Sequence, residues 1–136
     1  MGLFSGSRPA DLGHAAGGFA QGDWRPNWLS STAPREDAKH YIAPIAISGD
    51  AAKAWAALEA LVNAMPRATI VKRSPGYLHV EFASKAMGFV DDGQFALDAA
   101  GGMIHVKSAA RLGVRDFSVN RDRVEAIRSA LSQRSN

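Results

Sequence analysis

The sequence predicts an α+β fold, an antiparallel sheet of about five strands with two helices packed on one face. Apolar residues recur at every second position in stretches between residues 69 and 109, and short turns separate these stretches. Apolar residues also recur at helical spacing in one segment before this region and in one segment after it. The expected order is therefore β-α-β-β-β-β-α. A single domain spans residues 41–136 and follows an irregular N-terminal arm over residues 1–40.

The arm is rich in glycine, proline, serine and aspartate and shows no sustained hydrophobic period. It nevertheless contains Phe19, Trp24 and Trp28, and disordered segments are usually poor in aromatic residues. We expect the arm from about Phe19 onward to lie over the domain with its aromatic side chains tucked in. The first dozen residues are expected to be loose.

Residues 41–47 (YIAPIAI) predict a short strand, and Pro44 confines it to a sheet edge or to a strand start because proline cannot donate to the ladder. Ser48, Gly49 and Asp50 then offer a helix cap. Spacings of four, three, four and three predict an amphipathic helix through the apolar residues Ala51, Trp55, Leu58, Val62 and Met65. Pro66 ends this helix.

Four strands are expected next, at residues 69–72, 77–83, 89–97 and 103–109. Residues 91–93 interrupt the third of these strands, and a bulge there is one explanation. The second strand has Leu78, Val80 and Phe82 on one face and Tyr77, His79 and Glu81 on the other. In the fourth strand, His105 and Lys107 lie opposite the apolar residues. Finally, Asn120 can cap a helix whose apolar stripe is Val124, Ile127 and Leu131.

The charge distribution is uneven along the chain. The net charge is +3, and the whole excess lies in residues 111–136, where every basic residue is arginine. This segment contains no dense basic run with interleaved aromatics, so we expect no nucleic-acid binding. The sequence has no apolar run long enough for a membrane helix and no signal-peptide pattern at its start. We therefore expect a cytoplasmic protein without a transmembrane segment.

Three stretches together carry a family resemblance: RPNWLSS (25–31), YLHVEFASKAMGFVDDGQF (77–95) and SAARLGVRDFSVNRDRVEAIR (108–128). The chain resembles the DUF1499 family through this combination, and the resemblance covers nearly all of it. No reaction follows from the resemblance, because the family has no assigned function.

One departure from the family pattern is informative. Relatives often carry a cysteine on each side of the Pro-Asn motif, as in C-x-x-x-P-N-C-V-S-S, and the corresponding positions here are Gly22 and Trp28. The resemblance therefore implies that this chain lacks a staple that relatives could form, and that Trp28 holds the arm by apolar burial instead. The chain has no cysteine, which excludes disulfides and thiolate chemistry.

Residues 108–128 concentrate charge where the last strand gives way to the last helix. Arg111 and Asp116 flank Gly113, and with Asp91 they could form an ion-pair lock with arginine at its centre. The alternative is an anion site in which Arg111 is helped by Asn120 and Arg121 at the helix N-terminus. Asp91 and Asp92 make a poor joint metal site, because neighbours on a regular strand face opposite ways. We expect no metal and no cofactor.

Two further groups are candidates. His79, Glu81 and His105 share the side opposite the apolar residues, which fits either an exposed polar face or an acid–base or metal site. Trp24, Trp28 and Tyr77 are either core aromatics or the lining of a pocket. No HExxH, GxSxG, P-loop or GxGxxG motif is present.

The leading functional expectation is a non-enzymatic module that binds a small ligand or a protein partner in a groove between sheet and helices. The first alternative is a hydrolase- or transferase-like enzyme on an anionic substrate, which would use Arg111 with Asp91, Asp116 or His79. The second alternative is a structural scaffold without a pocket.

Overall fold

The computed structural model describes residues 6–15, 18–85, 88–113 and 118–134. Two helices and a mostly antiparallel sheet confirm the α+β prediction, with more strands than expected. The elements are β1 (His14–Ala15), β2 (Gly18–Phe19), β3 (Trp28–Ser30), β4 (Ile45–Ala46), α1 (Ala51–Ala64), β5 (Ala68–Ser74), β6 (Tyr77–Ala83), β7 (Val90–Asp98), β8 (Met103–Ala110) and α2 (Val119–Arg134).

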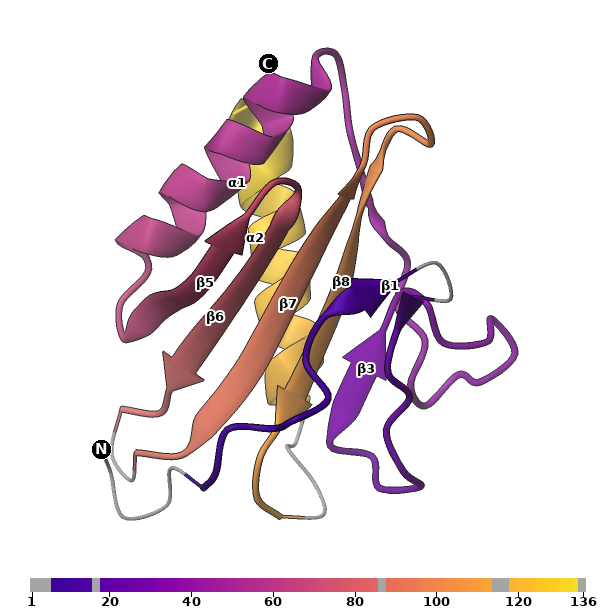
Figure 1. The fold of residues 1–136 in the computed structure, drawn as a ribbon, viewed down its shortest axis with the longest axis vertical. Helices are drawn as coiled ribbons and strands as arrows, with labels where there is room; N and C mark the ends of the chain where they lie inside the picture. The colour runs from indigo at the N-terminus through magenta and orange to yellow at the C-terminus, as the bar shows by residue number, and fades with distance from the viewer. Residues whose placement is uncertain (1–5, 16–17, 86–87, 114–117, 135–136) are drawn as a thin grey trace.

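The main sheet has the strand order β3-β8-β7-β6-β5, and β4 also pairs with β8. Strands β5 to β8 form the expected meander, in which each strand pairs antiparallel with the next. Both helices lie on one side of this sheet, and the arm with the small β1–β2 hairpin crosses the other side (Figure 1). We call this second side the arm face. The two sides of the sheet therefore have different coverings.

The helix side of the sheet holds the hydrophobic core. Its most deeply buried side chains come from alternate positions along β6, β7 and β8 and from one stripe of each helix. They are Leu78, Val80, Phe95, Ile104, Val106, Leu58, Val62, Val124 and Ile127. Helix α1 begins as predicted, because the Asp50 side chain accepts hydrogen bonds from the backbone N–H groups of Ala52 and Lys53. Alternation and capping thus account for the core elements.

Three local predictions are wrong, and one strand of the main sheet was not predicted. The strand predicted at 41–47 is only β4, and strand β3 was not predicted. Strand β7 runs without interruption, with continuous pairing to both neighbours, while the register shift lies in β5 between Ile70 and Lys72. Helix α2 begins at Val119, so Asn120 lies inside the first turn rather than at the cap. Its side chain points to β8 instead, since the Ser108 hydroxyl donates to it.

The described part of the arm is more ordered against the sheet than expected. Arg8 donates to Glu81 over 2.7 Å, and the Gly13 N–H donates to the Gln94 side chain over 2.8 Å. Phe19 is buried as predicted, whereas Trp24 is 69% exposed. The arm therefore covers polar residues of the sheet that the sequence alone left open to water.

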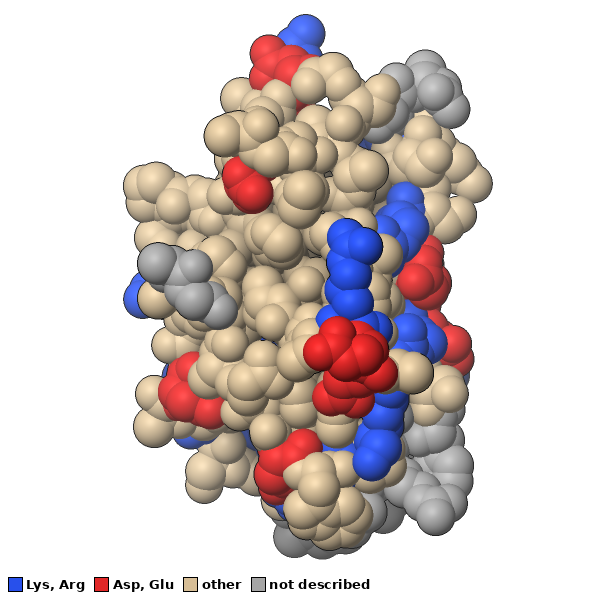
Figure 2. Space-filling model, turned by 90° about the vertical axis from the view of Figure 1, so that its right-hand side faces the viewer, with Lys and Arg blue, Asp and Glu red and all other residues tan. Residues whose placement is uncertain are grey.

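No helix within the described residues has the length and apolar character needed to cross a bilayer. On the side of the molecule seen in Figure 2, lysine and arginine intermingle with aspartate and glutamate along one band instead of forming a single-sign patch. This side therefore carries charges of both signs next to one another.

Candidate functional site

A charged cluster lies on the arm face near the end of β8. Arg111 follows β8 and donates from Nε to Asp92 Oδ2 over 2.7 Å and from Nη2 to Asp92 Oδ1 over 2.9 Å. Its Nη2 atom also lies 2.5 Å from Glu81 Oε2 on β6, and that carboxylate accepts from Arg8 of the arm as well. The Arg111 side chain is only 2% exposed. One buried guanidinium thus joins two strands and, through Glu81, the arm.

His79 completes this cluster. Its Nε2 atom lies 2.6 Å from Asp92 Oδ1, and both side chains are buried. Burial alone would raise the pKa of Asp92, but hydrogen bonds from Arg111 and His79 outweigh it and hold the pKa below its ordinary value. Glu81 behaves alike: burial acts to raise its pKa, and the hydrogen bonds from Arg8 and Arg111 lower it. Both carboxylates are therefore held in the charged form.

The predicted partners of Arg111 need correction. Asp91 points to the helix side of β7, where it accepts from Arg123 of α2 over 2.9 Å, so Asp92 takes the place expected for Asp91. Asp116 lies outside the described residues. Arg121 donates to the Tyr41 carbonyl over 3.2 Å. Because β7 is a regular strand, consecutive side chains face opposite sides of the sheet, so only Asp92 of the two aspartates faces Arg111.

The same cluster has the composition of a small metal site. One ligand atom from each of His79, Glu81 and Asp92 lies within 4.8 Å of the others. Arg111, however, already contacts both carboxylates. The guanidinium therefore supplies the positive charge that a metal ion would bring, and the arrangement fits an ion-pair lock better than a metal centre.

The remaining candidate residues are dispersed. His105 on β8 lies apart from His79, 3.1 Å from the Ser31 hydroxyl and 3.9 Å from Asp98. Tyr77 donates to Gln94 over 2.7 Å, and burial raises the pKa of this phenol to about 12. Trp24 is exposed. The three candidate aromatics therefore do not line one pocket together.

A pocket of about 310 Å³ lies between the arm and the sheet, within the size range of small-molecule sites. We call it the arm pocket. Its sheet side is formed by Asp92 and Gln94 of β7, Lys107 of β8 and Arg111, and arm residues that include Asp11, Gly22, Arg25 and Trp28 enclose it. A polar, partly buried cavity therefore adjoins the charged cluster.

Two buried side chains leave donors available in this pocket. Gln94 and Lys107 are directly paired on β7 and β8 and are 2% and 6% exposed. The Gly13 N–H can only donate, so the Gln94 atom facing it is the carbonyl oxygen, and the NH₂ group makes no hydrogen bond with a described residue. Lys107 Nζ donates to the Ala20 carbonyl over 2.7 Å and has no ion-pair partner among the described residues.

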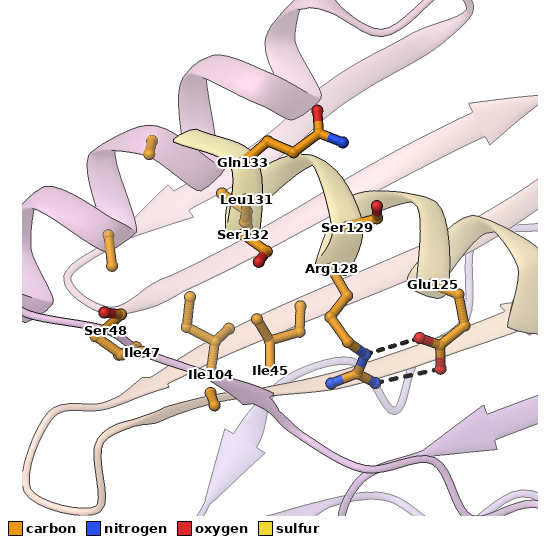
Figure 3. Close-up of a pocket in the computed structure, with 13 residues that line it drawn as sticks. Ile45, Ile47, Ser48, Ile104, Glu125, Arg128, Ser129, Leu131, Ser132 and Gln133 are labelled. Atoms are coloured by element: carbon orange, nitrogen blue, oxygen red, sulfur yellow. Dashed lines mark hydrogen bonds and ion pairs between the residues drawn. The ribbon is translucent and has the colours of Figure 1, made fainter. Parts of the chain in front are cut away.

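A second hollow of about 720 Å³ lies between α1, α2, β4 and β8. Figure 3 shows Ile45, Ile104 and Leu131 in it, with polar side chains of α2 around them. Arg128 is engaged there, since it donates to Glu125 and to the carbonyls of Ala43 and Pro44. The groove between sheet and helices therefore presents apolar surface and a satisfied ion pair.

Comparison with protein families assigns the chain to one family. The family model described as a protein of unknown function, DUF1499, matches residues 23–131. The chain belongs to the DUF1499 family. Neither the curated proteins nor the solved structures include a match to it.

Two positions singled out by the DUF1499 resemblance touch one another. A Cβ atom placed on Gly22 would lie 2.4 Å from the Trp28 indole. The indole is fixed, because it stacks on His40 with ring centroids 3.9 Å apart and donates from Nε1 to the Asp23 carbonyl. In this DUF1499 protein, Trp28 thus fills the space beside Gly22 and is 6% exposed.

Sequence reasoning placed Lys107 on the polar face of its strand but missed its burial and the burial of Gln94 beside it. The aromatic residues of the arm were the available signal, because they predicted that part of the arm packs on the domain. No pattern in the sequence indicated that Arg8 and Gly13 contact the sheet. In this DUF1499 protein they complete the cover over the arm face.

Proposed function

We propose that this DUF1499 protein is a non-enzymatic binding module that holds a small carboxylate-bearing ligand in the arm pocket. The observation that carries the proposal is the pair Gln94 and Lys107, two buried neighbours whose N–H donors are not used up. A carboxylate has two oxygens and can accept from an amide and an ammonium group side by side.

The electrostatics of Lys107 support an anionic ligand. Burial lowers the pKa of Lys107, because the ammonium group has lost water without gaining a carboxylate partner among the described residues. A bound carboxylate would provide that partner in a site where water screens little. The ammonium group of Lys107 also lies over the Trp28 ring, with Nζ 5.8 Å from the ring centre.

The enzymatic alternative is less well supported by the contacts of its residues. Arg111, the expected anion clamp, is bound to Asp92 and Glu81. Asp91 lies on the helix side of the sheet, away from the arm pocket, and His79 is not among the residues that line the pocket. A scaffold without a pocket would have no need of buried donor residues in the lining of a cavity.

Native mass spectrometry beside a denatured control tests for a ligand retained from the cell. Thermal unfolding with added succinate, compared with the uncharged succinamide, tests the chemistry directly. We expect succinate alone to raise the melting temperature, because binding to the folded state stabilises it by mass action.

The Lys107→Met variant sharpens this test, because methionine keeps the apolar stem and removes the ammonium group. Its response to succinate should be lost, whereas Lys53→Met, on the exposed surface of α1, should respond like the parent. An unchanged response in Lys107→Met, or an equal response to succinamide, would refute the proposal.

A further inference from the structure

The charges that line the arm pocket do not all cancel. Arg111 is paired with Asp92, and Arg25 is paired with Asp23 over 2.7 Å. Two lining side chains remain without an ion-pair partner among the described residues, namely Lys107 on the sheet and Asp11 on the arm. The pocket therefore has one unpaired positive charge and one unpaired negative charge.

These two charges lie at different depths. Lys107 is buried on β8 beside Gln94, whereas Asp11 is exposed on the arm. The carboxylate of Asp11 still acts on Lys107, since it opposes the lowering of the Lys107 pKa by burial. Among the residues that line the pocket, the unpaired positive charge is thus buried and the unpaired negative charge is exposed.

We infer that the ligand of the arm pocket is a small dipolar molecule, an amino acid or a short amine-terminated acid. Its carboxylate lies against Lys107 and Gln94, and its ammonium group lies toward Asp11. This inference rests on the proposed carboxylate site and extends it by a second recognition element.

The second element changes selectivity more than affinity. An ammonium group near Asp11 gains attraction, and a plain carboxylic acid of the same size gains none there. Because Asp11 is exposed, solvent screens the pair, and the gain is expected to be at most about fivefold in affinity. The contact at Lys107 is buried and charge-assisted, so its loss is expected to weaken binding by more than about tenfold.

Matched pairs of probes test this. Glycine, β-alanine and γ-aminobutyrate each have a partner in which a methyl replaces the ammonium group, namely propanoate, butanoate and pentanoate. Titrations of ¹⁵N-labelled protein would follow the Gln94 side-chain NH₂ and the Gly13 amide, whose N–H donates to the Gln94 carbonyl oxygen. We expect at least one amino acid to bind more tightly than its methyl partner, with both signals shifting.

The Asp11→Asn variant should remove that preference by weakening amino-acid binding to the level of the methyl partner. Glu36→Gln, an exposed acid of the arm that does not line the pocket, should keep the preference. Equal affinities within every pair, or a preference that survives Asp11→Asn, would overturn the dipolar ligand and leave the carboxylate site standing. If no acid of either series shifts the Gln94 signal, the carboxylate site itself is wrong.

Discussion

Arg111 holds Asp92 through two parallel hydrogen bonds, from Nε to Oδ2 over 2.7 Å and from Nη2 to Oδ1 over 2.9 Å. Both side chains are almost fully buried, and the same Nη2 reaches Glu81 on β6. A bidentate pair of this kind fixes direction as well as charge. The pair therefore ties the residue after β8 to the middle of the meander, close to the arm pocket.

Replacing Arg111 with alanine should destabilise the protein strongly. The substitution leaves Asp92 buried without its cation, and breaking a buried ion pair costs about 3–5 kcal/mol. Urea unfolding followed by circular dichroism would measure the loss in free energy of unfolding.

Arg73→Ala provides the matched control, because Arg73 donates from Nε to Glu59 over 2.8 Å on the exposed surface. Exposed pairs contribute about 0–1 kcal/mol. If both variants were as stable as the parent, the cluster would not be a lock.

The stability of the parent should fall in acid because of Asp92. Hydrogen bonds from Arg111 and His79 lower the folded-state pKa below the ordinary 3.8, against the effect of burial. The charged carboxylate therefore contributes its full stability above 3.8, and this is lost as the pH falls through the folded-state pKa. Unfolding free energies from pH 5 downward would show a shallower acid slope in Asp92→Asn, and equal slopes would contradict the assignment.

The sequence predicted the cluster only in outline. The alternation in β6 placed His79 and Glu81 on one face, because the apolar residues Leu78, Val80 and Phe82 occupy the other face. Asp91 and Asp92 break the apolar period of β7, which suggested an interruption. In the structure each has an arginine on its own side, Arg123 for Asp91 and Arg111 for Asp92. Pairing between distant segments leaves no mark in the local pattern.

Lys107 should make the free energy of unfolding rise with pH in the alkaline range. Burial lowers the folded-state pKa of Lys107 below the ordinary 10.5. At pH values between the folded-state pKa and 10.5, the unfolded chain therefore binds more protons than the folded protein, and the free energy of unfolding rises with pH. At pH values below the folded-state pKa, the buried ammonium group lowers the free energy of unfolding by a constant amount. Lys107→Met should therefore be more stable than the parent near neutral pH, and the difference should narrow toward pH 10.5. Unfolding curves across this range test this, with Lys53→Met as the surface control.

The two tryptophans of the arm should differ sharply. Trp28→Ala removes a buried indole that stacks on His40, and such a change costs about 3–5 kcal/mol. Trp24→Ala should change the free energy of unfolding by less than about 0.5 kcal/mol, because Trp24 is 69% exposed. Thermal unfolding of both variants compares them directly. Similar losses in the two would show that the arm does not depend on the Trp28 contact.

The arm itself marks the limit of prediction from sequence. Its aromatics indicated packing, and Phe19 and Trp28 are buried, but nothing distinguished Trp24 from them. Strand β3 is three residues long, too short to show a period, and it forms because its backbone pairs with β8. Short elements that depend on a partner far along the chain are decided by tertiary structure.

Gly22→Ala should destabilise the protein by about 1–3 kcal/mol, because the added methyl would meet an indole that cannot yield. In a Trp28→Ala background the same change should cost little. The coupling from the double-mutant cycle, measured by urea unfolding, tests this. Additive losses would mean that the two side chains do not compete for space.

The contact between Gly22 and Trp28 also has a meaning for the history of the chain. The glycine is needed only while the indole fills the space beside it. The two positions are therefore epistatic, because the effect of a substitution at either one depends on the residue at the other. A lineage that carries small side chains at both sites can accept the tryptophan only after position 22 has lost its Cβ. Descendants that keep the tryptophan must then also keep the glycine.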